Sequence, residues 1–166
     1  MYSRPIVPPD FVVPQRLEEE GFHLRMLCVD DVVKDFDAIM ASRTTLKAIM
    51  SPTDPWPEGL TLAENLIDLG WHQREFTLGH SFAYTVMAPD ESHCLGCCYI
   101  YPSDRQGYDA AAFYWGRGDR LQEGLEERIG LAFRAWLKRR WPFKMVAFPG
   151  RDISWETWGG LAHAGS

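Results

Sequence analysis

The sequence lacks any apolar run long enough to cross a membrane. A spanning helix needs roughly 20 mainly apolar residues, and no run among the 166 residues approaches that length. The first 14 residues also lack the apolar core of a signal peptide. We therefore expect a cytoplasmic protein with no membrane partner.

Cysteine is too scarce and too clustered for a disulfide framework. Three of the four cysteines, Cys94, Cys97 and Cys98, fall in one strand-like run, and Cys28 stands apart. A structural zinc site usually takes its ligands from two separated pairs, and the sequence has no second pair. A regular strand would also point Cys94 and Cys97 to opposite faces. We expect buried thiols and no metal.

Positive charge is in deficit as well. The formal net charge of −6 argues against general nucleic-acid binding. Tryptophan, in contrast, is abundant, with seven residues. Tryptophan side chains bury large areas, and in a pocket they stack on flat ligands.

The spacing of apolar residues predicts one α/β domain over residues 16–166, preceded by a proline-rich arm over residues 1–15. Short connections between the three middle strands favour an antiparallel meander. The second helix carries Leu62, Leu66, Leu69 and Phe76 on one face, which predicts its buried side. The expected elements are a strand over 21–29, a helix capped by Asp30 or Asp31, a helix opened by the capping box Thr61–Glu64 and ending near Gly79, strands over 82–87, 94–101 and 110–115, a helix from about Leu121 to Arg140, a strand over 144–148 and a helix over 153–161.

This order, βααβββαβα, resembles the GNAT N-acetyltransferases, especially the ribosomal-protein acetyltransferases. The resemblance is carried by Leu24–Leu27 with Asp31, Cys94–Cys97, Phe113–Trp115 and Arg151–Ser154. It implies a mixed α+β sheet of the GNAT-like acyl-CoA N-acyltransferase fold. It also implies acetyl-CoA as cofactor and an acceptor that is a small-molecule amine or a peptide N-terminus. The two strands that close the family's sheet have no residues left to form them.

The resemblance places the cofactor at the loop that leads into the long helix. Its diphosphate would lie on the N–H groups of residues 121–126, because the first turn of a helix presents free donors. Arg117 and Arg120 would assist. The residues that this placement assigns to cofactor binding are Trp115, Arg117, Arg120, Leu121, Gln122, Glu123, Gly124 and Leu125.

The same loop departs from the family pattern, which reads Gln/Arg-x-x-Gly-x-Gly/Ala. With Gly124 on the middle glycine, Leu121 and Glu126 stand where the pattern has Gln or Arg and Gly or Ala. The alternative is an ordinary surface helix start, in which Glu123, Glu126 and Glu127 suit the positive end of the helix.

Acylation of an amine requires a base, a donor for the developing oxyanion and an acid for the leaving thiolate. The base candidates are Glu75, His72 one helical turn away, and Asp109. Tyr114 and Ser154 are candidates for the acid or an orienting group. For His72 and Glu75 the alternative is a solvent-facing helix surface, and for Tyr114 it is core packing. The expected function is N-acetyl transfer, and the alternative is a catalytically silent GNAT-like module that binds a flat ligand or pairs with itself.

The strand over 144–148 would be an exposed apolar edge of the sheet, which invites pairing with another chain. Trp155 and Trp158, three residues apart, would lie on one face of the last helix beside that edge. They would cover the edge within one chain or bury against a second copy. A homodimer is the favoured expectation.

Overall fold

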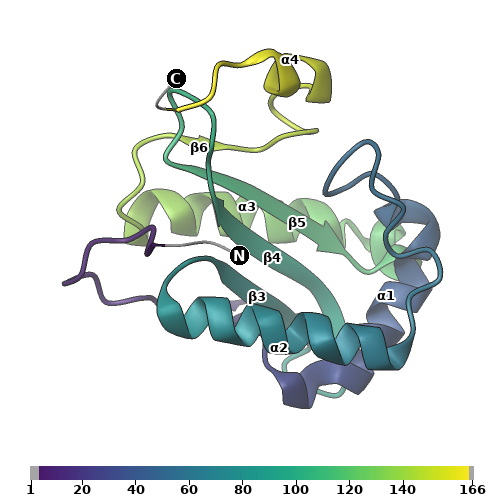
Figure 1. Cartoon of the computed structure of the whole chain (residues 1–166). Coiled ribbons are helices and arrows are strands. Elements are labelled where there is room, and N and C mark those ends of the chain that lie inside the picture. Colours follow the sequence, from purple (N-terminus) through teal and green to yellow (C-terminus); the bar gives the residue numbers. More distant parts are fainter. Residues whose placement is uncertain (1–3, 165–166) are drawn as a thin grey trace.

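The computed structural model describes residues 4–164, which form one six-stranded sheet with helices on both faces (Figure 1). The strands lie in chain order across the sheet; neighbours are antiparallel up to β5, and β6 runs parallel to β5. The strands are β1 (Arg16–Glu19), β2 (Phe22–Met26), β3 (Phe82–Met87), β4 (Cys94–Pro102), β5 (Ala110–Gly116) and β6 (Val146–Ala147). The helices are α1 (Val32–Leu46), α2 (Leu62–Leu78), α3 (Leu125–Arg140) and α4 (Trp155–Gly160), with 3-10 turns η1 (Val29–Asp31) and η2 (Gly118–Glu123).

The sheet separates two hydrophobic cores. Helices α1 and α2 cover one face and α3 covers the other (Figure 1). Successive side chains of β4 alternate between them, as the pleat of a strand requires. Cys97 and Tyr99 enter the core under α1, and Cys98 and Ile100 enter the core under α3.

The predicted meander of three strands and the limits of the second helix are confirmed. Strands β3, β4 and β5 begin at the predicted residues and end within one residue of the predicted ends. At the start of α2, the Thr61 hydroxyl accepts the N–H of Glu64 at 3.2 Å, and the Glu64 carboxylate accepts the N–H of Thr61 at 2.9 Å. The helix ends at Gly79, which adopts a positive φ of 73° that glycine allows without strain.

The ends of the sheet differ from the prediction. The strand predicted over 21–29 is shorter, β2, and it forms a hairpin around Gly21, whose φ is 88°, with the unpredicted strand β1. Only Leu17 of β1 is buried, so its sequence carries little alternation to detect. The last strand is reduced to Val146 and Ala147 because the chain diverges from β5 after two paired residues. Helix α3 starts at Leu125, after the turn η2, rather than near Leu121.

The predicted buried face of α2 is partly wrong. Leu62 and Leu66 are 46% and 45% exposed, whereas Asn65 and Leu69 are buried. The helix is thus rotated so that a polar residue faces the interior. A pattern based on hydrophobicity cannot detect this rotation, because it depends on the partner that Asn65 meets on α1.

The orientation predicted for the cysteines is also wrong. The pairing of β3 with β4 shifts between Val86, opposite Gly96, and Met87, opposite Cys94. This β-bulge inserts one extra residue, so the usual alternation is broken. Cys94 and Cys97 therefore enter the same core, where both are fully buried.

The described segments before β1 and after β6 contact the sheet and its connections. In the arm, the N–H of Ile6 donates to the carbonyl of Gly79, and Tyr84 Oη donates to the carbonyl of Pro14; residues 1–3 of the predicted arm lie outside the described residues. After β6 the described chain forms no further strand. Helix α4 follows, and its continuation pairs with the β4–β5 loop through a bridge between Arg105 and His163. Of the helices within residues 4–164, none combines the length and apolar character that crossing a bilayer requires.

The two tryptophans of α4 contact aromatic rings of β5 and of the loop before it. Trp155 stacks on Phe113 of β5 at 6.2 Å between ring centres, and Trp158 meets Tyr108 at 5.6 Å. Both are half-buried by the chain itself. The helix thus packs beside β5 and the loop before it, and the homodimer stays a prediction.

Thr61→Ala should lower the free energy of unfolding by about 0.5–2 kcal/mol, because it removes the acceptor that caps α2. Urea unfolding of the variant and the parent measures the difference. Thr77→Ala is the control, since the Thr77 hydroxyl only donates to the Gln73 carbonyl within the same helix and alanine is the better helix former. Equal losses in the two variants would contradict a specific role for the cap.

Candidate active site

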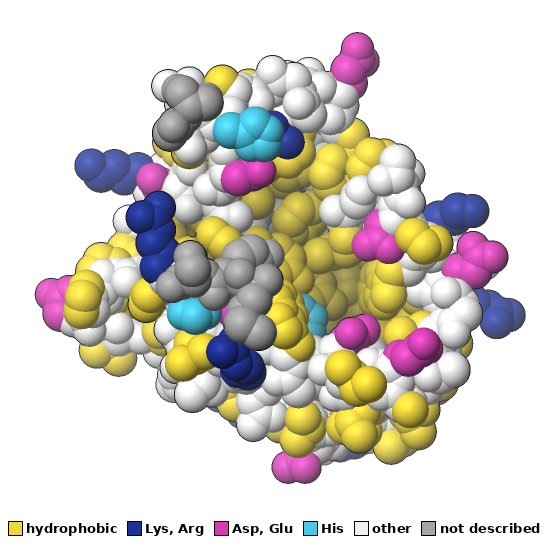
Figure 2. Space-filling model, viewed as in Figure 1, with side chains coloured by type: hydrophobic (Ala, Val, Ile, Leu, Met, Phe, Trp, Pro, Cys, Tyr) yellow, Lys and Arg dark blue, Asp and Glu magenta, His cyan; other side chains and the backbone are white. Residues whose placement is uncertain are grey.

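A cavity of about 250 Å³ opens between α1, α2, the α1–α2 loop and β4. Figure 2 shows it as a hollow with a hydrophobic floor, acidic side chains at the rim and a histidine within it. The polar side chains inside this hollow come from helix faces that pack toward the sheet. This combination of an apolar pocket with a few convergent polar groups is typical of ligand sites.

Asp35 of α1 is the most deeply buried carboxyl of this cavity, at 2% exposure. Asn65 Nδ2 of α2 donates to its Oδ2 at 2.8 Å, and the Cys97 thiol of β4 donates to its Oδ1 at 3.5 Å. Burial raises the pKa of Asp35 to about 6, although these two hydrogen bonds act to lower it. The carboxyl therefore holds a proton more readily than an ordinary aspartate.

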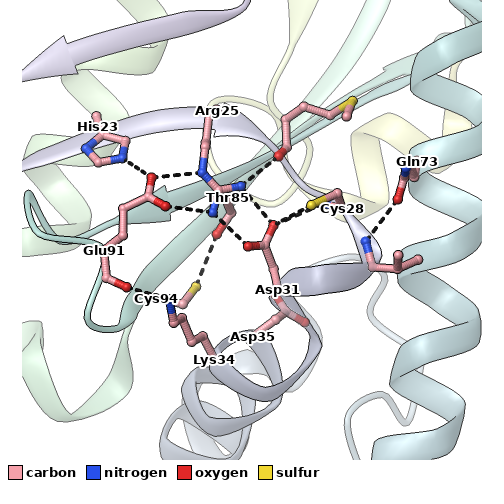
Figure 3. A network of polar contacts seen from close by, with 12 residues as sticks. His23, Arg25, Cys28, Asp31, Lys34, Asp35, Gln73, Thr85, Glu91 and Cys94 are labelled. Atoms are coloured by element: carbon pink, nitrogen blue, oxygen red, sulfur yellow. Dashed lines mark hydrogen bonds and ion pairs between the residues drawn. The ribbon is translucent and has the colours of Figure 1, made fainter.

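An ion-pair network lies at the start of α1, one helical turn before Asp35 (Figure 3). Arg25 of β2 binds Asp31 at 2.7 Å and Glu91, in the β3–β4 turn, at 2.9 Å. Hydrogen bonds from Arg25 and His23 lower the pKa of Glu91 to about 2, so this carboxylate stays charged. Asp35 lies four residues after Asp31 on the same side of the chain, so the Asp31 charge adds to the rise in the pKa of Asp35.

His72 of α2 also lines the cavity, where it is half-buried and has an unused hydrogen-bonding atom. Its ring is 5.1 Å from that of Trp71 and 5.5 Å from that of Tyr99. Burial lowers the pKa of His72 to about 4, so the imidazole is neutral at neutral pH. Within residues 4–164, its buried Nδ1 has no hydrogen-bond partner. An unsatisfied buried polar atom costs about 1–3 kcal/mol, and a ligand that met it would remove that cost.

The structure corrects the alternative considered for the two residues of α2. Neither His72 nor Glu75 lies on a solvent-facing surface, because both turn toward the protein interior. Glu75 is fully buried. Its carboxylate contacts Arg74, and it lies 2.9 Å from Nδ1 of His80. Glu75 is outside the cavity lining, whereas His72 is part of it.

The other predicted catalytic residues lie outside this cavity as well. The Asp109 carboxylate accepts the N–H groups of Lys144 and Met145 at 2.7 and 2.9 Å, which ties β5 to β6. Ser154 caps α4 by accepting the N–H of Thr157 at 3.1 Å. Their catalytic roles stay predictions.

Tyr114 packs against α3, on the opposite face of the sheet. An added Cβ at Gly130 would lie 2.6 Å from the Tyr114 ring, so the glycine makes room for the tyrosine. The guanidinium of Arg134 lies 5.7 Å from the centre of the same ring. This placement favours the core-packing alternative for Tyr114.

A second cavity, of about 120 Å³, lies where β5 and the chain after β6 diverge. Arg151 occupies this opening: it donates to the Tyr114 carbonyl at 2.7 Å and stacks on the Tyr114 ring at 3.7 Å. The two cavities meet across a contact between Tyr101, which lines the first, and Phe113, which lines the second. Their ring centres are 5.9 Å apart.

The backbone around the second cavity fits a diphosphate coenzyme. The strands part there, and the first turn of α3 has N–H groups without partners inside the helix. The side chains are less favourable, since the Glu126 carboxylate accepts the N–H of Gly116 at 3.0 Å and stands 3.7 Å from Arg151. A coenzyme would have to displace the Arg151 side chain from the opening.

The two arginines expected to assist a diphosphate are paired elsewhere. Arg117 binds Asp37 at 2.7 Å and Asp119 at 2.8 Å. Arg120 stands 3.6 Å from Glu123. These contacts agree with the alternative of an ordinary helix start, in which local acidic and basic residues neutralise one another.

The chain shares its architecture with solved acetyltransferases. The ribosomal-protein-S5-alanine acetyltransferase from Vibrio fischeri is 16% identical, with a TM-score of 0.60 over 75% of this chain and 67% of that one. An acetyltransferase from Salmonella typhimurium that modifies the N-terminal serine of ribosomal protein L7/L12 is 11% identical, with a TM-score of 0.60 over 76% and 69%. The fold is that of the GNAT acetyltransferases.

A third solved structure of this GNAT fold contains coenzyme A. It is the RimL ribosomal L7/L12 α-N-protein acetyltransferase, 14% identical with a TM-score of 0.58 over 74% of this chain and 66% of that one. Comparison of the sequence with models of protein families gives no match, and comparison with curated proteins gives none. At identities this low the likeness establishes the GNAT fold, and the activity has to be argued from the site.

Sequence reasoning missed Asp35 and Asn65, the two residues that join α1 to α2. A signal was present, because each lies four residues before a buried residue of its own helix, Ile39 and Leu69. A polar residue on a core-facing stripe must find a partner when it is buried. Two such residues on consecutive helices therefore indicate a polar contact between those helices.

Asp35→Asn should stabilise the protein more at pH 7 than at pH 4. The folded-state pKa of about 6 exceeds the ordinary 3.8, so the contribution of Asp35 is present below pH 4 and is lost as the pH rises through 6. The loss is about 3 kcal/mol at 1.36 kcal/mol per pKa unit. The lowered pKa of His72 gives its contribution to stability the opposite dependence on pH. This contribution is the same in the parent and the variant, so it cancels when the two are compared.

Urea unfolding of parent and variant at the two pH values measures this difference. Asp10→Asn, at an exposed position of the N-terminal arm, is the control and should show no comparable change. A stability gain for Asp35→Asn that is equal at pH 4 and pH 7 would mean that Asp35 does not ionise in the folded protein over this range.

Proposed function

We propose that the protein is an acetyl-CoA-dependent N-acetyltransferase that acts on an amine. The observation that carries this proposal is the pair of adjoining cavities in a GNAT fold. One lies at the start of α3, where the strands diverge, and the other contains a buried carboxyl and an unpartnered imidazole. The Tyr101–Phe113 contact separates them, so a donor and an acceptor would meet there.

The coenzyme would lie over the turn between β5 and α3. Acetyl-CoA, when bound, supplies the acetyl group as a thioester. The N–H groups at the start of α3, beginning with Leu125, would hold the diphosphate, and Gly124, with a φ of 70°, lets the backbone turn there. The other residues proposed for this role are Trp115, Arg117, Arg120, Leu121, Gln122 and Glu123.

The amine would lie in the larger cavity. Asp35 and Asp68 attract a protonated amine, and the raised pKa of Asp35 suits it to accept the proton that the amine must lose before it attacks. The neutral His72 would accept or donate a hydrogen bond at Nδ1 and orient the nitrogen. These two residues now lead the candidates for proton handling, ahead of Glu75 and Asp109.

The second candidate function is a catalytically silent GNAT-fold module that binds a flat ligand or pairs with itself. It is favoured by the occupied opening, in which Arg151 holds the Tyr114 carbonyl and Glu126 holds the N–H of Gly116. In that case the larger cavity would still bind a ligand, but no coenzyme would enter beside it.

Acetyl-CoA at about 100 times its dissociation constant should stabilise the protein by about 2.7 kcal/mol. For a chain of this size that corresponds to a rise in the thermal midpoint of roughly 5–10 °C. Thermal unfolding with and without acetyl-CoA measures it. An unchanged midpoint at millimolar acetyl-CoA would favour the silent module.

Charge changes at the loop should alter coenzyme affinity in opposite directions. Glu126→Ala should strengthen binding because it removes a carboxylate from the diphosphate site, and Arg120→Glu should weaken it because it adds one. Titration calorimetry with coenzyme A measures both. Glu156→Ala, on the exposed side of α4, is the control. Equal affinities in all variants would place the diphosphate elsewhere.

A further inference from the structure

The larger cavity is lined by acidic side chains, and no cation of residues 4–164 lines it. Three carboxyl groups line it, those of Asp35, Asp54 and Asp68. Among the described residues, no lysine or arginine lines the cavity. The hydrogen-bond donors that these carboxyls do meet are neutral: Asn65 and Cys97 for Asp35, and the N–H of Trp56 for Asp54. A ligand with a positive charge would supply the missing partner.

The walls of the cavity are aromatic. Trp56 comes from the α1–α2 loop, Trp71 from α2, and Tyr99 and Tyr101 from β4, where their rings are stacked at an angle of 7°. Aromatic faces attract cations, tryptophan most strongly, and they also stack on flat rings. An aromatic lining combined with carboxylates thus favours an organic cation over a hydrated metal ion.

His72 is an independent sign that a ligand belongs here. Its Nδ1 is buried and unpartnered within residues 4–164, while the ring is fixed between Trp71 and Tyr99. An ammonium N–H is a matching donor when Nδ1 carries the lone pair.

Size limits the ligand further. The volume of about 250 Å³ is below the roughly 300–1,000 Å³ of pockets that bind drug-sized molecules. It admits one ring with a short side chain, and a peptide would extend out of it after its first residue.

We propose that this cavity binds a small aromatic ammonium ion, a primary amine joined to one flat ring by a short chain. The ammonium group lies among Asp35, Asp68 and His72, and the ring lies against Trp56 and Trp71. This inference rests on the proposed function, in which the bound amine is the acetyl acceptor.

Phenethylamine is the probe, and 2-phenylethanol is its neutral counterpart of nearly equal shape. Binding is measured by titration calorimetry and by quenching of tryptophan fluorescence, since two tryptophans line the cavity. Phenethylamine should bind one site at pH 7 at least about tenfold more tightly than the alcohol, because only the amine carries the charge. Tetra-alanine, which has an N-terminal ammonium without a ring, should bind more weakly than phenethylamine.

Two variants test whether phenethylamine binds in this cavity. Asp68→Asn, at the exposed rim, should weaken phenethylamine binding by about tenfold and leave binding of the alcohol unchanged. Glu58→Gln, an exposed residue of the same loop region outside the cavity lining, should change neither. Equal binding of amine and alcohol, no binding of either, or tighter binding of tetra-alanine would each overturn the proposal.

Coenzyme binding is measured separately on the same samples, so the two proposals fail differently. If acetyl-CoA raises the thermal midpoint and phenethylamine does not bind, the assigned substrate class is wrong and acetyl transfer stands. If phenethylamine binds with the expected charge dependence and acetyl-CoA does not bind, the cavity assignment holds and the acetyltransferase proposal fails.

Discussion

The buried hydrogen bond between Asp35 and Asn65 is the contact on which the site depends. It joins α1 to α2, and the Cys97 thiol connects the same carboxyl to β4. Without Asn65 the carboxyl would lose its strongest neutral donor at a depth where an unsatisfied group is costly. The rotation of α2 follows from this contact, because turning Asn65 inward exposes Leu62 and Leu66 and brings His72 over the cavity.

Local sequence signals were sufficient for most of the framework. The capping box at Thr61, the terminal Gly79 and the apolar runs of β3, β4 and β5 act within a few residues, so their positions could be predicted. The order of elements was sufficient to suggest the GNAT fold. The errors came where a distant partner decides the outcome, as in the bulge that turns Cys94 to the same core as Cys97.

The candidate site was harder to predict because its polar residues are placed against the hydrophobic pattern. His72 was found by residue type, but its position off the apolar stripe assigned it to solvent. Asp35 was not found at all, since a single aspartate in an apolar helix repeat looks like an exposed neighbour. Polar residues that are buried against the hydrophobic pattern of their helix often belong to functional sites. Their burial lowers the stability of the fold, so it is not explained by folding alone.

The two cavities would need opposite charge for the proposed reaction, and their side chains supply it to different degrees. The proposed amine side needs negative charge, which Asp35, Asp54 and Asp68 supply, with no lysine or arginine of residues 4–164 in the lining. The proposed coenzyme side would need positive charge or free N–H groups, yet the Glu126 carboxylate lies there, 3.7 Å from Arg151. A carboxylate that accepts the N–H of Gly116 stabilises the turn before α3 in the absence of coenzyme. A coenzyme that bound there would replace the contact between Glu126 and Gly116 with its own contacts. Its affinity would therefore depend on the difference in free energy between the lost and the gained contacts, and not on the phosphate contacts alone.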